Sequence, residues 1–210
     1  MIRTRVKICG FTRVEDAVYA AQSGVDAIGL VFYPPSPRNV DIGQAIKIVN
    51  ALPAFVSVVA LFVDAPETRI REVLNNVPID CLQFHGDEPA NECRQYDKRY
   101  LKAIRMQPDI NISRLAEDYH DAAGLLLDAY DSGIKGGTGS PFNWDLVPKK
   151  SILPIVLAGG LDINNVKQAI HQVRPYAVDV SSGVEADKGI KDNVKMATFI
   201  REVNETDKIL

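Results

Sequence analysis

Residues 5–32 read RVKICGFTRVEDAVYAAQSGVDAIGLVF and hold the repeating unit that decides the fold of this chain. The unit starts with an apolar strand pattern at 6–9 and ends with a second one at 27–32. Between them, residues 14–22 have the apolar spacing of a helix that covers a sheet. A strand, a helix and a further strand in this order predict a βαβ unit with two parallel strands.

The same alternation continues to the end of the chain. Apolar, β-branched runs predict strands at 6–9, 27–32, 55–62, 81–84, 100–104, 124–127, 154–157 and 176–180. Helical patterns fall between and after them at 14–22, 42–50, 67–75, 91–95, 112–119, 164–173 and 192–203. Such repetition predicts an α/β fold, a parallel eight-stranded (β/α)8 TIM barrel formed by a single domain of residues 1–210. An open doubly wound sheet is the alternative, but neither GxGxxG after the first strand nor GxxxxGK[ST] occurs.

Composition and charge limit the classes of partner. The 210 residues carry a formal net charge of −3, which argues against a nucleic-acid or anionic-membrane surface as the main partner. No apolar run approaches the roughly 18 residues of a membrane span. Three cysteines without a CxxC pair predict a reducing compartment, with neither a disulfide framework nor a zinc site. The first strand begins close to Met1, so we expect no signal peptide and a cytoplasmic protein.

Cys9 ends the first predicted strand, with Lys7 on the same face of that strand. The thiolate does the chemistry of cysteine, and a nearby ammonium favours it, so Lys7 predicts a lowered pKa for the Cys9 thiol. The alternative is a small buried core residue, which is what most free cysteines are. The strand alone does not decide between these two interpretations.

Three further side chains follow predicted strands, at the end of a barrel where reactive groups lie. Asp128 ends an apolar strand, where loss of water contact would make it a candidate general acid; a turn-capping role is the alternative. Arg38 lies in the stiff, proline-rich loop 34–39, and its guanidinium suits bidentate binding of a carboxylate unless it is a solvated surface arginine. His85 follows the fourth strand, where it could contact substrate or only hold its loop.

Two loops of small residues predict a phosphate site. Gly159-Gly160 and Ser181-Ser182-Gly183 follow the seventh and eighth strands, where barrels commonly bind phosphate. Small residues let backbone N–H groups approach an anion, and a following helix start adds its positive end. Two ordinary glycine turns are the alternative. The glycine-rich segment 128–139 is long for a compact domain and predicts a lid over the site.

Taken together, these segments resemble a known family, phosphoribosylanthranilate isomerase of tryptophan biosynthesis. The matching segments are spread over nearly the whole chain, at 7–10, 36–38, 85–88, 127–128, 136–139, 157–161 and 179–185. Two small departures are Phe84, where leucine is more usual, and Asn143, where aspartate is more usual. Neither departure falls on the proposed chemistry.

The resemblance implies an Amadori rearrangement of N-(5-phosphoribosyl)anthranilate to 1-(2-carboxyphenylamino)-1-deoxyribulose 5-phosphate. It implies that Asp128 is the general acid that opens the ribose ring, and that Cys9 is the base that removes the C2 proton. Arg38 would bind the anthranilate carboxylate, and Asp179 would lie near the aromatic ring. We also expect His85 to contact the substrate. The implied phosphate contacts are Gly159, Gly160, Ser182 and Gly183, with Gly137 closing over them. No metal and no cofactor is expected.

Other functions remain open on the same fold. An aminoaldose isomerase of histidine biosynthesis usually has paired aspartates, whereas Cys9 ends the first strand here. Indoleglycerol-phosphate synthase usually has several catalytic lysines and glutamates, and only Lys7 is comparable. A non-catalytic sensor of phosphate ligands would bind without turnover. The expected partner is a small-molecule phosphosugar, and the sequence leaves open whether the protein is a monomer or a homodimer.

Overall fold

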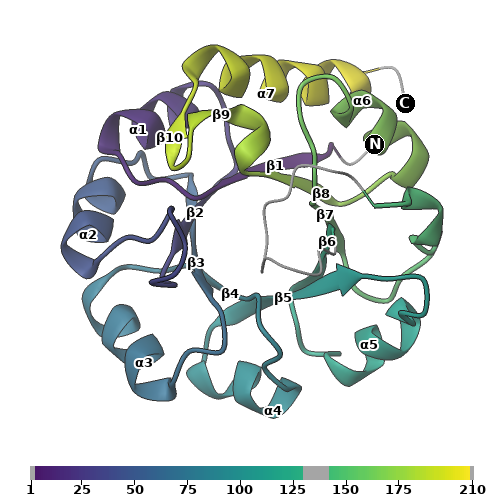
Figure 1. Cartoon of the computed structure of the whole chain (residues 1–210), viewed down its shortest axis with the longest axis horizontal. Coiled ribbons are helices and arrows are strands. Elements are labelled where there is room, and N and C mark those ends of the chain that lie inside the picture. The colour runs from purple at the N-terminus through teal and green to yellow at the C-terminus, as the bar shows by residue number, and fades with distance from the viewer. Residues whose placement is uncertain (1–2, 130–141, 209–210) are drawn as a thin grey trace.

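The computed structural model describes residues 3–129 and 142–208 of the chain. Its parallel strands form a closed barrel, in which each strand pairs with the next and β8 pairs with β1 (Figure 1). The barrel strands are β1 (Arg5–Cys9), β2 (Ala27–Val31), β3 (Ser57–Phe62), β4 (Cys81–Phe84), β5 (Arg99–Met106), β6 (Gly124–Ala129), β7 (Ile155–Leu157) and β8 (Ala177–Val180). The predicted (β/α)8 barrel is confirmed.

Helices form a ring around the barrel, and an α-helix lies between successive strands except β6 and β7, where the described residues hold only a 3₁₀ turn (Figure 1). The α-helices of the described residues are α1 (Val14–Gln22), α2 (Ile42–Asn50), α3 (Glu67–Asn76), α4 (Ala90–Cys93), α5 (Ile112–Asp118), α6 (Val166–Val173) and α7 (Asn193–Asp207). Short 3₁₀ turns add η1 (Arg94–Tyr96), η2 (Trp144–Leu146) and η3 (Ser182–Val184). No helix within residues 3–129 and 142–208 is long and apolar enough to cross a membrane.

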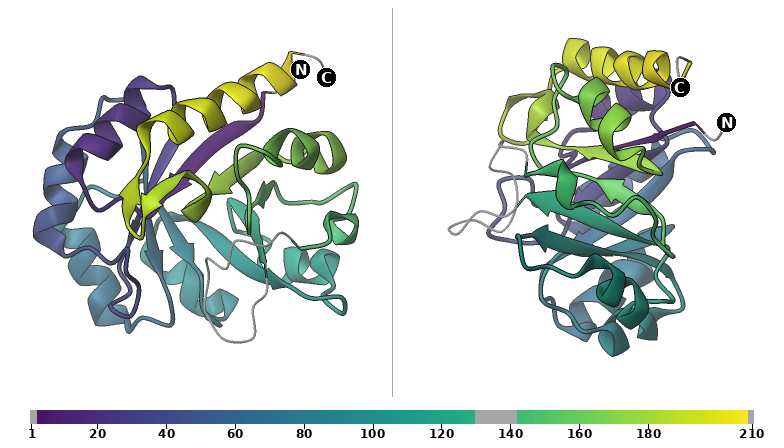
Figure 2. Two further views of the ribbon diagram at one scale, coloured as in Figure 1. Left: turned by 45° about the horizontal axis from the view of Figure 1, so that its top comes forward. Right: turned by 90° about the vertical axis from the view of Figure 1, so that its right-hand side faces the viewer.

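The predicted element bounds agree with the structure to within about two residues, except that the last helix ends at Asp207 and not at 203, and that an unpredicted hairpin follows β8. Strand pairing in β3 begins at Ser57, which lies opposite Ala27, so the apolar Phe55 falls in the preceding loop and is 99% exposed. After β8 the chain forms an antiparallel hairpin of β9 (Glu185–Asp187) and β10 (Ile190–Lys191), which no sequence pattern predicted (Figure 2). This hairpin lies between β8 and α7.

Apolar side chains fill both faces of the barrel strands, as two-sided burial of a parallel sheet requires. Most of the core packs between strands and helices, and includes Ile8, Ile28, Leu82 and Leu125, which are fully buried. A second cluster fills the barrel interior. Its central members are consecutive register partners across four strands: Ala103, Leu126, Val156 and Ala177. These four side chains therefore fill the barrel interior at one level. The polar side chains of the interior lie beyond that level, toward the carboxyl ends of the strands.

Candidate active site

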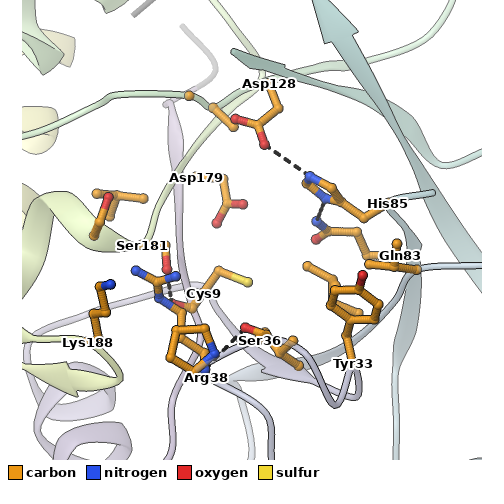
Figure 3. A pocket seen from close by; sticks show the side chains of 18 of the residues that line it. Cys9, Tyr33, Ser36, Arg38, Gln83, His85, Asp128, Asp179, Ser181 and Lys188 are labelled. Carbon is orange, nitrogen blue, oxygen red and sulfur yellow. Dashed lines mark hydrogen bonds and ion pairs between the residues drawn. The ribbon is translucent and has the colours of Figure 1, made fainter. Parts of the chain in front are cut away.

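A cavity of about 500 Å³ opens at the carboxyl ends of the strands (Figure 3). The structure brings most of the predicted site residues to its wall, namely Cys9, Arg38, His85, Asp128, Gly159, Gly160, Asp179 and Ser182. Gly183 does not line the cavity but belongs to η3, in the same loop as Ser182. Gly137, with most of the predicted lid at 128–139, lies outside the described residues.

Cys9 lies on the inner face of β1, as Lys7 does two residues before it, and a glycine on the neighbouring strand leaves room for its side chain. Gly29 is the register partner of Cys9, and a Cβ atom at Gly29 would lie only 2.5 Å from the Cys9 Sγ atom. The backbone carbonyl of Cys9 accepts a hydrogen bond of 2.9 Å from Ser181 Oγ on the loop after β8. Cys9 is 5% exposed and lies at the cavity wall.

Lys7 forms a buried ion pair with Asp179 and also interacts with the Cys9 thiol. The Lys7 Nζ atom lies 2.9 Å from each carboxylate oxygen of Asp179, and both side chains are buried. Burial raises the pKa of the Cys9 thiol, and the opposing charge of Lys7 does not outweigh it. The prediction of a lowered pKa for Cys9 is therefore wrong, because the thiol loses its water contacts and Asp179 shares the nearby cation.

Asp128 is held by two hydrogen bonds at the end of β6. Its Oδ1 atom accepts from the backbone N–H of Ala129 at 2.9 Å, and its Oδ2 atom lies 3.0 Å from His85 Nε2. The other ring nitrogen of His85, Nδ1, lies 2.9 Å from the Gln83 side-chain nitrogen. Figure 3 shows these three side chains as a continuous chain along one side of the cavity. His85 thus holds Asp128, and its predicted contact with the substrate stays a prediction.

A buried ion pair anchors the loop that carries His85. Lys102 Nζ donates to Glu88 Oε2 at 2.8 Å and to the Gly86 carbonyl at 2.7 Å. Glu88 in turn accepts hydrogen bonds from the backbone N–H groups of Gly86 and Asp64. These bonds fix the loop after β4 against β5, so that the imidazole is presented in a set orientation.

Arg38 is oriented by a carboxylate of its own chain. Its Nε and Nη2 atoms donate to the two carboxylate oxygens of Glu185, each at 2.7 Å, and Lys191 Nζ donates to Glu185 Oε1 at 2.8 Å. The Arg38 side chain is only 15% exposed, so it is not a solvated surface arginine. Lys191 also donates to the Ser181 carbonyl at 3.1 Å. The hairpin β9–β10 is thereby tied to the loops after β2 and β8.

The two predicted phosphate loops pack directly against one another. A Cβ atom at Gly183 would lie 2.0 Å from the carbonyl oxygen of Leu161, so only glycine allows this approach. Asp162 Oδ1 accepts from the backbone N–H groups of Asn164 and Asn165, and Asn165 donates to the Gly160 carbonyl at 2.8 Å. These hydrogen bonds hold the loop after β7 in place. The loop leads directly into α6, whose first N–H groups are the kind of donor that a phosphate site uses.

Several cavity residues were not identified from the sequence. Gln83 could have been found, because it lies two residues before His85 and so shares its strand face. Lys188 lines the cavity from the unpredicted hairpin, near Arg38 in Figure 3. Tyr33 lies on the wall from the loop after β2. Within the part of the chain that the structure describes, no group of three or more His, Cys, Asp or Glu side chains could hold a metal ion.

Comparison with known proteins gives a consistent result. Residues 6–202 match the family model described as N-(5'phosphoribosyl)anthranilate (PRA) isomerase. The N-(5'-phosphoribosyl)anthranilate isomerase of Nitrosococcus oceani is 55% identical, and the match covers 97% of this chain and 98% of that protein. That of Pseudomonas aeruginosa PAO1 is 56% identical, over 97% of this chain and 96% of that protein.

Solved structures agree with the sequence relatives. The crystal structure of phosphoribosyl anthranilate isomerase from Thermotoga maritima is similar with a TM-score of 0.88 and 38% identity, covering 96% of this chain and 99% of that one. A second structure of phosphoribosyl anthranilate isomerase is a complex with reduced 1-(o-carboxyphenylamino)-1-deoxyribulose 5-phosphate. It has a TM-score of 0.85 and 38% identity, with the same coverage.

Proposed function

Since this chain belongs to the N-(5'-phosphoribosyl)anthranilate isomerase family, we propose that its cavity carries out the family's reaction with Asp128 as general acid and Cys9 as general base. The chain is an isomerase of tryptophan biosynthesis, and its substrate is a phosphosugar that carries an anthranilate. The observation that supports the assignment is the convergence of Asp128, Cys9, Arg38 and both small-residue loops on one cavity.

The reaction begins with protonation of the ribose ring oxygen by Asp128. The bond between this oxygen and C1 breaks, and the anthranilate nitrogen forms a Schiff base with C1. Proton transfer by a positioned side chain is worth about 10²- to 10⁴-fold in rate. Asp128 suits this step because its carboxylate lies at the cavity wall with only 8% exposure, where water competes little.

The second step is removal of the C2 proton by the Cys9 thiolate. The resulting enolamine tautomerises to the ketone, and C1 gains a proton. Because burial raises the pKa of the Cys9 thiol, little thiolate is present at neutral pH, and we expect turnover to rise with pH until the thiolate forms. A base of raised pKa is also a stronger proton acceptor once it is formed.

Two anion sites hold the substrate at its ends. Arg38 binds the anthranilate carboxylate, with Glu185 fixing the plane of the guanidinium. The loops of Gly159-Gly160 and Ser182-Gly183 bind the phosphate through backbone N–H groups near the start of α6. We extend the proposal to His85, Asp179 and Gly137 as further substrate contacts, to a single domain over 1–210, to a cytoplasmic location and to a monomer or homodimer.

The test of this proposal is a turnover assay with N-(5'-phosphoribosyl)anthranilate, followed by the loss of its fluorescence. We expect wild-type turnover, and a loss of about 10²- to 10⁴-fold in kcat for both Cys9→Ala and Asp128→Asn. The matched controls are Cys81→Ala and Asp118→Asn, which lie outside the cavity and should retain wild-type kcat. Binding without turnover by the folded wild type would indicate a phosphate-ligand sensor, and wild-type kcat in either site variant would refute that residue's role.

A further inference from the structure

Gln83 carries a buried polar atom that the proposed chemistry does not use. Its side chain is completely buried on β4 and faces the barrel interior, two residues before His85. The amide nitrogen lies 2.9 Å from His85 Nδ1, but the amide oxygen has no hydrogen-bond partner among the described residues. A buried acceptor without a partner destabilises a fold, so its presence here calls for a functional explanation.

The contact between Gln83 and His85 fixes where the imidazole proton lies. An amide nitrogen only donates hydrogen bonds, so Nδ1 of His85 must accept and the proton of a neutral ring is on Nε2. That proton points at Asp128 Oδ2, 3.0 Å away, while Oδ1 already accepts from the N–H of Ala129. Both carboxylate oxygens of Asp128 then act as acceptors. This is the form of the pair that lacks the proton a general acid must give.

The His85–Asp128 pair that still carries this proton, which we call the proton-loaded pair, needs the opposite orientation of the Gln83 amide. With one more proton, the pair is either a protonated Asp128 beside neutral His85 or an Asp128 carboxylate beside an imidazolium. In the first form Asp128 donates to Nε2, so the ring proton is on Nδ1; in the second form both ring nitrogens carry protons. Each form therefore needs an acceptor at Nδ1. A half-turn of the Gln83 amide puts its unpaired oxygen at that place.

We propose that Gln83 is a positioning residue whose amide turns between two orientations, one for the proton-loaded and one for the proton-depleted His85–Asp128 pair. The inference rests on the proposed role of Asp128 as general acid. In one cycle the loaded pair gives one proton to the ring oxygen of the substrate, where it becomes the hydrogen of a hydroxyl group. The amide then donates to Nδ1, and it turns back when the pair takes one proton from solvent.

Other charged groups lie around the His85–Asp128 pair. They lie on β1, β5, β8 and the loop after β4, and comprise Lys7, Cys9, Lys102, Arg105, Asp179, Asp87 and Glu88. Arg105 Nη2 donates to the His85 carbonyl at 3.3 Å, and the Lys7–Asp179 and Lys102–Glu88 pairs are each neutral overall. Gln83→Leu leaves all of these charges in place and adds none, whereas Gln83→Glu adds a negative charge beside the pair.

The test compares Gln83→Leu with Gln83→Glu in the kcat–pH profile, whose high-pH limb is assigned to the acid proton, and not to the Cys9 thiol, where it coincides with loss of the His85 Nδ1 proton. Gln83→Leu removes the acceptor, so we expect kcat to fall about 10- to 100-fold and the high-pH limb to move to lower pH. Gln83→Glu keeps an acceptor at Nδ1, so the limb should move to higher pH. The control Gln95→Leu, outside the cavity, should leave the profile unchanged.

A second measurement does not depend on the variants folding. The chain has three histidines, so ¹⁵N chemical shifts of the His85 ring can be assigned in the wild-type protein. We expect Nδ1 to carry a proton below the high-pH limb and to lose it above. The inference would be overturned if Nδ1 lacked a proton both below and above the high-pH limb. It would also be overturned if the limb moved in the same direction in both Gln83 variants, or in neither of them. If these results hold but Asp128→Asn keeps wild-type kcat, the proposed acid role fails instead.

Discussion

Substitution of Glu185 by glutamine tests how much the buried ion pairs of Glu185 with Arg38 and Lys191 stabilise the fold. Glu185 accepts two hydrogen bonds of 2.7 Å from Arg38 and one of 2.8 Å from Lys191. Glutamine keeps the shape of the side chain and one acceptor oxygen. It leaves the two cations without the negative charge that they share.

The expected loss of stability follows from the burial of this network. The Lys191 side chain is 0% exposed and that of Glu185 is 6% exposed. Removing one partner of a buried ion pair costs about 3–5 kcal/mol. Because Arg38 remains 15% exposed and one acceptor oxygen is kept, we expect the free energy of unfolding to fall by about 2–3 kcal/mol. For a chain of this length, that lowers Tm by about 4–12 °C.

Thermal unfolding followed by circular dichroism measures this change. The matched control is Glu72→Gln, whose carboxylate also lies 2.7 Å from an arginine, Arg69, but on an exposed face. An exposed pair contributes about 0–1 kcal/mol, so the control should change Tm by no more than about 4 °C. Equal effects of the two substitutions would refute the view that burial gives the Glu185 network its strength.

The pH dependence of this difference has a definite sign. Burial would raise the pKa of Glu185, but the hydrogen bonds from Arg38 and the charge of Lys191 outweigh it, so the pKa is lowered from 4.5. The stabilisation is therefore present above about pH 4.5 and is lost as the pH falls through the lower, folded-state pKa. The Tm difference between wild type and Glu185→Gln should shrink over that acidic range.

Three other predictions concern the substrate site. Arg38→Ala should lower kcat/KM about 10- to 150-fold for the natural substrate, but not for an analogue without the anthranilate carboxylate; equal losses would mean that Arg38 only supports its loop. Iodoacetamide should label Cys9 more slowly than a free thiol at neutral pH and faster as pH rises, because burial raises the pKa of this thiol; mass spectrometry showing fast labelling at pH 7 would contradict this. Ser182→Asp should weaken binding of a phosphorylated product analogue by about 10-fold or more, whereas Ser182→Ala should have little effect, since backbone N–H groups remain; calorimetry measures both.

The barrel could be predicted from the sequence because its signal is local and repeated. Each strand and helix pattern is read within about ten residues, and the alternation of the two patterns defines the topology. The hairpin β9–β10 gave no such signal, because its strands are only three and two residues long. Phe55 shows the converse error, since an apolar side chain before a strand need not be buried.

The site was predictable where position on a strand determines exposure to the cavity. Cys9 is the last residue of β1 and Asp128 the last but one of β6, both on the inner face, so both could be assigned to the cavity wall. The partners of the charged groups could not be assigned. Lys7 and Asp179 lie 172 positions apart in the chain, and Arg38 and Glu185 lie 147 apart, so only the closed barrel brings them together. The pKa of Cys9 was mispredicted mainly because burial removes water from the thiol, and also because Asp179 shares the cation of Lys7.

A crystal structure of this protein with reduced 1-(o-carboxyphenylamino)-1-deoxyribulose 5-phosphate, the ligand named for the related complex, tests the proposed site most directly. We predict that C2 of the sugar lies about 3–4 Å from Cys9 Sγ and that an Asp128 carboxylate oxygen lies about 2.6–3.2 Å from the former ring oxygen. The carboxylate should contact Arg38, and the phosphate should lie on the loops of Gly160 and Ser182. A phosphate bound elsewhere, or a sugar with C2 far from Cys9, would contradict the assignment of acid and base.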